Sequence, residues 1–257
     1  MFFNNRDQFI NLKSSTMKST ILLLTMALLF THLLMAGDYE KDTFRTDSDK
    51  ELTITFIKHG SLMLTYEGQQ IQLDPVTMFA DYSTFAKADL ILVTHEHGDH
   101  LDAKAIDALT KDNTRLILNP SSREILNKGE EISNGERLQL TDAITLDAVP
   151  AYNTTPGREQ YHPRHRDNGY ILTIDGLRIY IAGDTEDIPE MRELKEIDIA
   201  FLPVNQPYTM TVAQAVRAAK MFSPKVLYPY HFGETDVIPI REKLKESGID
   251  VRIRKME

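Results

Sequence analysis

Short apolar segments, separated at regular intervals by glycine and proline, constrain the fold of this chain most strongly. Between residues 53 and 75, three segments alternate apolar and polar residues, with Gly60 and Gly68 at the breaks and Pro75 after the last segment. A period of two residues with glycine at the turns is typical of an antiparallel β-meander. This region is therefore predicted to open the fold with three short strands.

Strands and helices alternate after this meander, and the second half of the chain repeats the style without repeating the sequence. Each half runs from strands into helices, which favours two sheets face to face with helices outside. We predict an α+β fold, a four-layer αββα sandwich, formed by one domain over residues 53–257. Further strands are expected at 88–95, 114–120, 136–140, 144–151, 169–176, 177–185, 197–205 and 225–233, and helices at 101–110, 123–129 (capped by Ser121 or Ser122), 189–196 (begun by Pro189), 212–222 (capped by Thr211) and 239–248.

The N-terminal segment has the pattern of an export signal. Lys18 precedes an apolar run at 21–35, and the small residues Ala36 and Gly37 follow it. A basic start, a short apolar stretch and a small-residue exit are typical of a secretory signal peptide, and the run is short for a membrane span. An uncleaved anchor is the alternative. We expect an exported protein, periplasmic or secreted, that is not stably inserted in a membrane after cleavage, with a signal peptide at 1–36 (Met17 being an alternative start) and a linker at 37–52.

Composition narrows the chemistry available to the chain. There is no cysteine, which excludes thiol catalysis, disulfides and cysteine-bound zinc, and leaves His, Asp and Glu as the strong metal ligands. The formal net charge is -9, and no block of five Lys or Arg residues occurs. Nucleic acid is therefore not an expected partner, and a small-molecule substrate is.

The stretch "VTHEHGDH" at residues 93–100 combines metal-ligating side chains with a favourable place in the fold. It follows a predicted buried strand and precedes a predicted helix, and it carries His95, His97, Asp99 and His100. Imidazoles and carboxylates bind zinc and similar cations, and four such groups on one turn can serve two ions if other loops complete the ligand sets. Asp184 and His231 also follow predicted strands, and we expect them to join this centre.

These motifs resemble those of the metallo-β-lactamase superfamily, in order and over nearly the whole of the predicted domain. The matching stretches are "HEHGDH", the "GDT" at 183–185, the "YHFG" at 230–233 and the early "LDP" at 73–75. The resemblance implies a metallo-β-lactamase fold and two divalent ions. It further implies that His95 and His97 bind one ion, that Asp99, His100 and His231 bind the other, that Asp184 bridges them, and that Asp74 orients the site.

Within that superfamily, residues 56–75 are similar to the opening of the branch that includes ascorbate-6-phosphate lactonase and N-acyl-phosphatidylethanolamine phospholipase D. The likeness places His59 on the substrate side of the cleft, as a candidate catalytic residue. An exposed turn histidine is the competing interpretation.

One position departs from the superfamily pattern. The loop after strand 144–151 normally supplies another metal-binding histidine, but Asn153 stands there, and a neutral amide binds zinc poorly. Either the first metal site is weakened, or a histidine further along the loop replaces the missing one. We favour His162 as the replacement, and we expect His165 to face solvent or substrate.

The expected activity is hydrolysis. We predict a metal-dependent hydrolase that uses a metal-bound hydroxide on an ester, lactone or phosphodiester, with two zinc ions (manganese or iron as alternatives) and Asp99 as proton shuttle. An exported metal-binding protein without catalysis and a redox di-iron protein are the alternatives. Side chains that could contact substrate are Tyr152, Tyr161, Tyr208, Arg158, Arg164 and Arg166.

Overall fold

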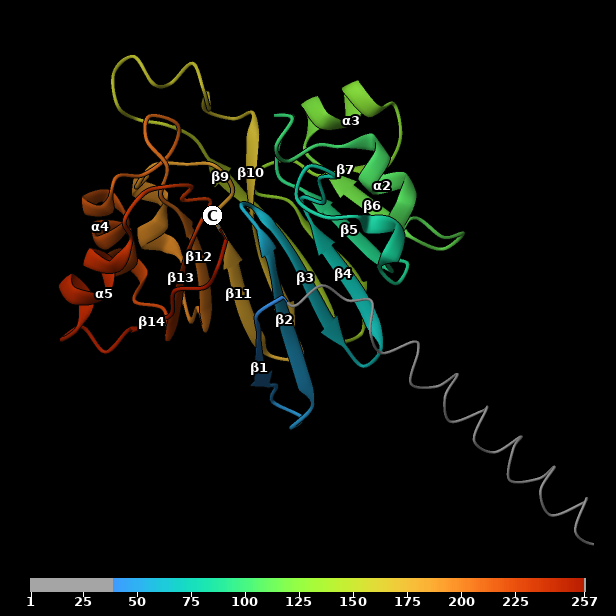
Figure 1. Cartoon of the computed structure of the whole chain (residues 1–257), viewed down its shortest axis with the longest axis horizontal. Helices are drawn as coiled ribbons and strands as arrows, with labels where there is room; N and C mark the ends of the chain where they lie inside the picture. Colours follow the sequence, from blue (N-terminus) through green and yellow to red (C-terminus); the bar gives the residue numbers. More distant parts are fainter. Residues whose placement is uncertain (1–38, 257) are drawn as a thin grey trace, which may run out of the picture. The chain divides into compact units, whose positions relative to one another are not determined.

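Two seven-stranded sheets build the part of the chain, residues 39–256, that a computed structural model describes (Figure 1). Both sheets are mixed in the same way, because the first four strands of each are antiparallel and the later ones are parallel. The first sheet has the order β1 (Lys41–Arg45), β2 (Glu51–Lys58), β3 (Ser61–Tyr66), β4 (Gln69–Leu73), β5 (Leu90–Val93), β6 (Arg115–Leu118) and β7 (Glu130–Glu131).

The strands of the second sheet are likewise neighbours in chain order. Its sequence across the sheet is β14 (Asp250–Val251), β13 (Val226–Tyr230), β12 (Ile199–Pro203), β11 (Leu177–Ile181), β10 (Asp167–Ile174), β9 (Ile144–Ala151) and β8 (Arg137–Thr141). The helical segments are the 3-10 turn η1 (Tyr82–Thr84), α2 (Ala103–Leu109), α3 (Pro120–Leu126), the 3-10 turn η2 (Pro189–Glu193), α4 (Val212–Phe222) and α5 (Ile238–Leu244).

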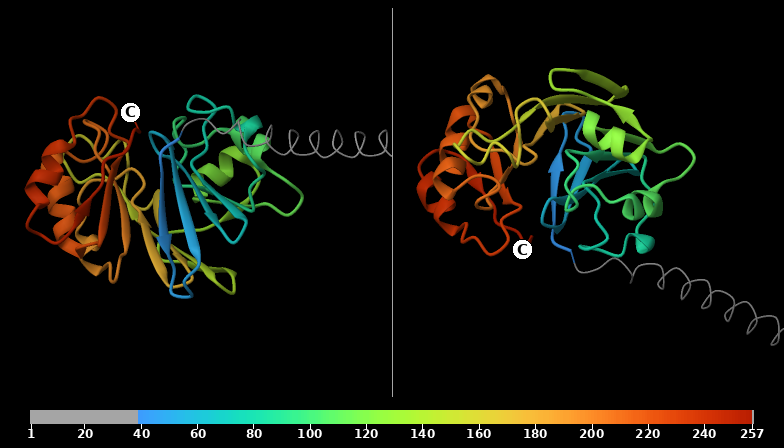
Figure 2. Two further views of the ribbon diagram at one scale, coloured as in Figure 1. Left: turned by 60° about the horizontal axis from the view of Figure 1, so that its bottom comes forward. Right: turned by 90° about the horizontal axis from the view of Figure 1, so that it is seen from above.

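The inner faces of the two sheets form the main core. Phe56 of β2 contacts Tyr228 of β13 across the interface, with ring centroids 4.9 Å apart. Helix α2 packs on the outer side of the first sheet, where its Ile106 belongs to the same apolar cluster as Ile91. Helix α4 covers the outer side of the second sheet (Figure 2), and its Phe222 packs edge-on against Tyr180 of β11. The predicted four-layer αββα sandwich is therefore confirmed.

Some predicted boundaries were wrong for local reasons. Helix α3 begins earlier than predicted, because Pro120 suits its first turn and Asn119, not Ser121 or Ser122, caps it. The segment after Pro189 is a 3-10 turn that ends at Glu193, and not a longer helix. The described part of the predicted linker is also ordered as strand β1, which pairs with β2.

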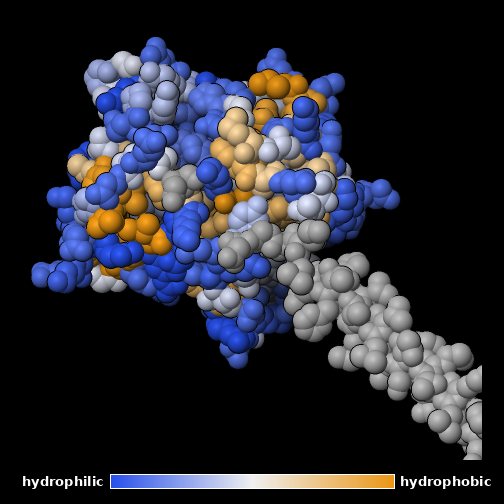
Figure 3. All heavy atoms as spheres, in the orientation of Figure 1, coloured by the Kyte–Doolittle hydropathy of each residue, from blue (hydrophilic) through white to orange (hydrophobic). Residues whose placement is uncertain are grey.

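The predicted signal peptide lies outside the described residues. Among residues 39–256, no helix is both long enough and apolar enough to cross a membrane. Most of the face seen in Figure 3 is hydrophilic, with apolar areas between the charged ones.

Candidate metal centre

Loops at one end of both sheets bring the predicted ligands together. The loop after β5 carries His95 to His100, and the ends of β11 and β13 lead to Asp184 and His231. A side chain that follows a buried strand emerges at the edge of the sheet, so loops from two facing sheets converge there. The arrangement places residues far apart in the sequence at one point.

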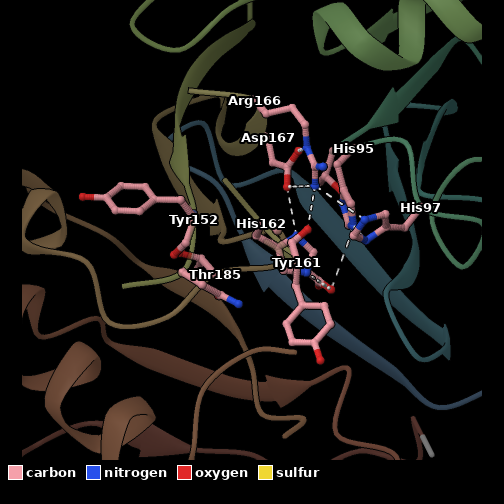
Figure 4. A network of polar contacts seen from close by, with 12 residues as sticks. His95, His97, Tyr152, Tyr161, His162, Arg166, Asp167 and Thr185 are labelled. Atoms are coloured by element: carbon pink, nitrogen blue, oxygen red, sulfur yellow. Dashed lines mark hydrogen bonds and ion pairs between the residues drawn. The ribbon is translucent and has the colours of Figure 1, made fainter. Parts of the chain in front are cut away.

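A first group of side chains consists of three imidazoles. His95, His97 and His162 each offer a ring nitrogen, and these atoms lie within 4.8 Å of one another. His162 comes from the long loop between β9 and β10, and its ring faces His95 and His97 (Figure 4). The structure thus brings the predicted replacement ligand to the other two histidines.

A second group joins three further imidazoles to a carboxylate. The ligand atoms of His59, Asp99, His100 and His231 also lie within 4.8 Å of one another. His59 occupies the two-residue turn between β2 and β3, and its Nε2 is 3.1 Å from Oδ2 of Asp99. The turn histidine is therefore part of the centre.

Asp184 lies between the two groups. Its Oδ2 is 3.4 Å from Nε2 of His162 and 3.3 Å from Nε2 of His231, and its Oδ1 is 3.5 Å from Nε2 of His100. Within residues 39–256, Nε2 of His100, Nε2 of His231 and Oδ1 of Asp184 are buried without a hydrogen-bond partner. Buried polar atoms that face one another without partners fit a bound cation.

Buried carboxylates hold two of the imidazoles from behind. Asp74 contacts Nδ1 of His100 at 2.8 Å and accepts hydrogen bonds from the Thr94 backbone and hydroxyl. Asp167 contacts Nδ1 of His162 at 2.9 Å. This contact fixes the ring and directs Nε2 toward the centre. Sequence reasoning missed Asp167, although an acidic residue at the start of a strand five positions after His162 was an available signal.

The electrostatics of the centre favour charged carboxylates. Burial opposes the ionisation of Asp99, but the imidazoles of His231 and His59, whose Nε2 atoms lie 3.5 and 3.1 Å from its Oδ2, hold its pKa well below the ordinary value. Burial also disfavours a charged His100, yet Asp184 and Asp74 raise the pKa of this imidazole to about 10. This high pKa keeps a second proton on the His100 ring. A cation that binds at Nε2 would replace that proton, and its positive charge would balance the charges of Asp184 and Asp74.

In the first group, burial and the neighbouring imidazoles lower the pKa values of His95 and His97. Desolvation, followed by the charges of His100 and His162, lowers the pKa of His95 well below its usual value. Desolvation likewise lowers the pKa of His97. Neutral imidazoles are the form that binds metal ions.

Asn153 supports the loop that carries His162. Its side-chain amide donates to the backbone oxygens of Arg158 and Tyr208, and its backbone N–H donates to the carbonyl of His162 at 2.9 Å. The asparagine thus braces the loop at the position where the superfamily pattern has a histidine. His165 is exposed in the same loop, as predicted.

The candidate substrate-contacting side chains are largely engaged within the protein. Tyr152 donates its hydroxyl to Glu190, which also pairs with Arg164 at 2.7 Å. Arg166 contacts Asp167 at 2.7 Å (Figure 4) and Glu96 at 2.9 Å. Arginines committed in this way hold the loop in place. Tyr208 differs, because 46% of it is exposed and its ring packs edge-on against Tyr161.

Comparison with known proteins identifies the family. A model of the β-lactamase superfamily domain matches residues 53–231. The chain belongs to the β-lactamase superfamily. Within it, the chain is 30% identical over 221 residues to a UPF0173 metal-dependent hydrolase of Archaeoglobus fulgidus, covering 79% of this chain and 94% of the relative. The predicted class, a metal-dependent hydrolase of this superfamily, is confirmed.

Solved structures agree with this assignment. A crystal structure from Parabacteroides distasonis, of a protein assigned as a metal-dependent hydrolase, is 65% identical and has a TM-score of 0.84. It covers 85% of this β-lactamase superfamily chain and 100% of that chain. Igni18, a metallo hydrolase from Ignicoccus hospitalis, shares the fold at 24% identity and a TM-score of 0.67, covering 79% of this chain and 95% of its own.

Proposed function

We propose that this chain hydrolyses an ester, lactone or phosphodiester bond of a small molecule at a centre of two divalent ions, zinc in the first instance. His95, His97 and His162 would hold the first ion. Asp99, His100 and His231 would hold the second, and Asp184 would contact both. Export to the periplasm or the medium belongs to the same proposal.

The position of Asp184 is the observation that carries this proposal. Its carboxylate faces Nε2 of His162 on one side at 3.4 Å and Nε2 of His231 on the other at 3.3 Å. A carboxylate between two imidazole groups can bind two ions at once, and two-ion sites are suited to hydrolysis. Ions bound there would acidify a water molecule and polarise the oxygen of the scissile bond.

The protein's own groups would prepare the reaction. Asp99 stays ionised because His231 and His59 keep its pKa low, and 40% of its side chain is exposed. An ionised, accessible carboxylate can accept a hydrogen bond from a water molecule and so orient it for attack. Asp74 and Asp167 keep the imidazoles of His100 and His162 in fixed orientations.

Metal analysis of three proteins tests the ligand assignment. Wild type should retain two ions per chain, and His162→Ala should retain about one, because the first ion loses an imidazole held by Asp167. His165→Ala is the matched control from the same loop, and it should retain both ions. Full metal content in His162→Ala would show that His162 is not a ligand.

Turnover tests the chemistry. Zinc-loaded wild type should hydrolyse a substrate from a panel of aryl esters, lactones and bis-aryl phosphodiesters, and His97→Ala should lose this activity while keeping its fold. A protein that binds two ions but turns over no member of the panel would favour a metal-binding role. Coloured, redox-active iron in the purified protein would favour the di-iron alternative.

A further inference from the structure

The ring nitrogen Nε2 of His59 lies close to the atoms of Asp99, His100 and His231 that could bind the second ion. It is 3.1 Å from Oδ2 of Asp99, and that oxygen also faces Nε2 of His231 at 3.5 Å and Nε2 of His100 at 3.9 Å. Three imidazole nitrogens therefore converge on one carboxylate oxygen. A cation bound next to this oxygen would be within reach of all three nitrogens.

This geometry differs from that of the residues that support ligands from behind. Asp74 and Asp167 contact Nδ1 of His100 and His162, on the side of each ring that faces away from the centre. Such outer contacts orient a ligand without reaching the ion. His59 instead presents its nitrogen beside the inner nitrogens of His100 and His231.

The backbone holds His59 in this position against a local preference. Its φ is 57°, and that of His231 is 48°, although non-glycine residues rarely occupy this region. The carbonyl of His59 accepts the N–H of His231 at 3.0 Å, and its own N–H donates to Met256 at 2.8 Å. Only 16% of the His59 side chain is exposed. The turn is thus fixed by two remote segments, and the ring is largely withdrawn from water.

We propose that His59 is a direct ligand of the second ion. The inference rests on the proposed two-ion centre and deepens it. The first ion would have four protein ligands, namely His95, His97, His162 and Asp184. The second would have five, namely His59, Asp99, His100, His231 and Asp184. Four ligands suit tetrahedral zinc, whereas a fifth suits a cation with a higher coordination number, such as Mn²⁺ or Fe²⁺.

Cobalt(II) is the probe for this difference in ligand number between the two sites, because its visible absorption grows stronger as the number of ligands falls from six to four. Metal-free protein is titrated with Co²⁺ alone. His59→Gln is the test variant, because its amide can still donate to Asp99 but is a poor ligand. His162→Ala identifies the absorption of the first ion, and His165→Ala serves as the matched control.

Wild type should bind two Co²⁺ ions with different absorption intensities. The absorption of the second ion is the signal that remains in His162→Ala. In His59→Gln this signal should become more intense, because the ion loses a ligand, and the Kd of the ion should rise on the order of tenfold or more. The signal of the first ion should not change. Circular dichroism of the metal-free variant checks the fold, and His59→Asn, which tolerates the left-handed backbone better, decides the matter if His59→Gln does not fold.

Two results would overturn this role of His59. One is a variant whose two cobalt signals and affinities equal those of wild type. The other is weaker binding with an unchanged spectrum, which would mean that His59 only orients Asp99. Fewer than two Co²⁺ ions in wild type would instead refute the two-ion centre itself, so the two failures are distinguishable.

Discussion

Gly60 shows how closely the residues of the centre are packed. A Cβ atom built on this glycine would lie 2.8 Å from Cε1 of His100 and 3.2 Å from its Nδ1. The ring cannot move away freely, because Asp74 holds Nδ1 at 2.8 Å. A side chain at position 60 is therefore incompatible with the observed place of His100.

Gly60→Ala should displace the His100 ring and release one metal ion. We expect overpacking to cost roughly 1–3 kcal/mol of the free energy of unfolding. Metal content per chain and a urea unfolding curve measure both effects. Gly98→Ala is the matched control inside the histidine loop, because a Cβ there meets nothing within 4 Å. Equal metal content in the two variants would contradict this account of Gly60.

At the scale of elements, the loop between β9 and β10 depends on Glu186. One oxygen of this buried carboxylate accepts the backbone N–H of Thr154 at 2.8 Å and of Thr155 at 2.6 Å. Its other oxygen is 3.6 Å from the guanidinium of Arg158. Burial opposes the charge of Glu186, yet these hydrogen bonds lower its pKa. The residue that follows "GDT" thus fixes the start of the loop that carries His162.

Glu186→Ala should loosen this loop and weaken metal retention at the first site. Two backbone N–H groups would lose their bonds to a charged carboxylate and Arg158 would lose one of its contacts, which costs roughly 1–3 kcal/mol. Dialysis against a chelator, followed by metal analysis, measures retention. Asp187→Ala is the neighbouring control, since its carboxylate pairs with Arg217 at 2.8 Å and has no hydrogen bond to the loop. Wild-type retention in Glu186→Ala would show that the loop holds His162 without this anchor.

The elements also show what sequence can predict. The long strands and helix α4 with its cap at Thr211 follow local periodicity, and they appear where that periodicity predicts them. Strands β7 and β14 have two residues each, and only pairing with a neighbour defines them, so no local pattern reveals them. Glu186 was missed for a similar reason, because its hydrogen bonds to Thr154 and Thr155 join segments that are distant in the sequence.

For the molecule as a whole, Asp42 joins the beginning of the described chain to its end. This residue of β1 pairs with Arg252 at 3.2 Å and with Arg254 at 2.7 Å, and it accepts the hydroxyl of Tyr228. The side chain of Asp42 is only 12% exposed. The cluster thus ties the first sheet to the segment after β14, whose Met256 supports His59.

Asp42→Asn should destabilise the protein in a pH-dependent manner. Burial opposes the charge of Asp42, but hydrogen bonds from Arg254, Tyr228 and Arg252 lower its pKa below 3.8. A carboxyl whose pKa is depressed on folding stabilises the protein above its unfolded pKa, and this contribution disappears as the pH falls through the folded value. The variant should therefore lose about 2 kcal/mol at neutral pH, and the difference from wild type should shrink below about pH 4.

Urea unfolding at several pH values measures this difference. Asp250→Asn is the matched control, because Asp250 pairs with Arg252 and 55% of its side chain is exposed. An exposed ion pair contributes less than about 1 kcal/mol, so the control should change little at any pH. A constant deficit for Asp42→Asn across the whole pH range would mean that packing, and not the charge of Asp42, joins the sheets here.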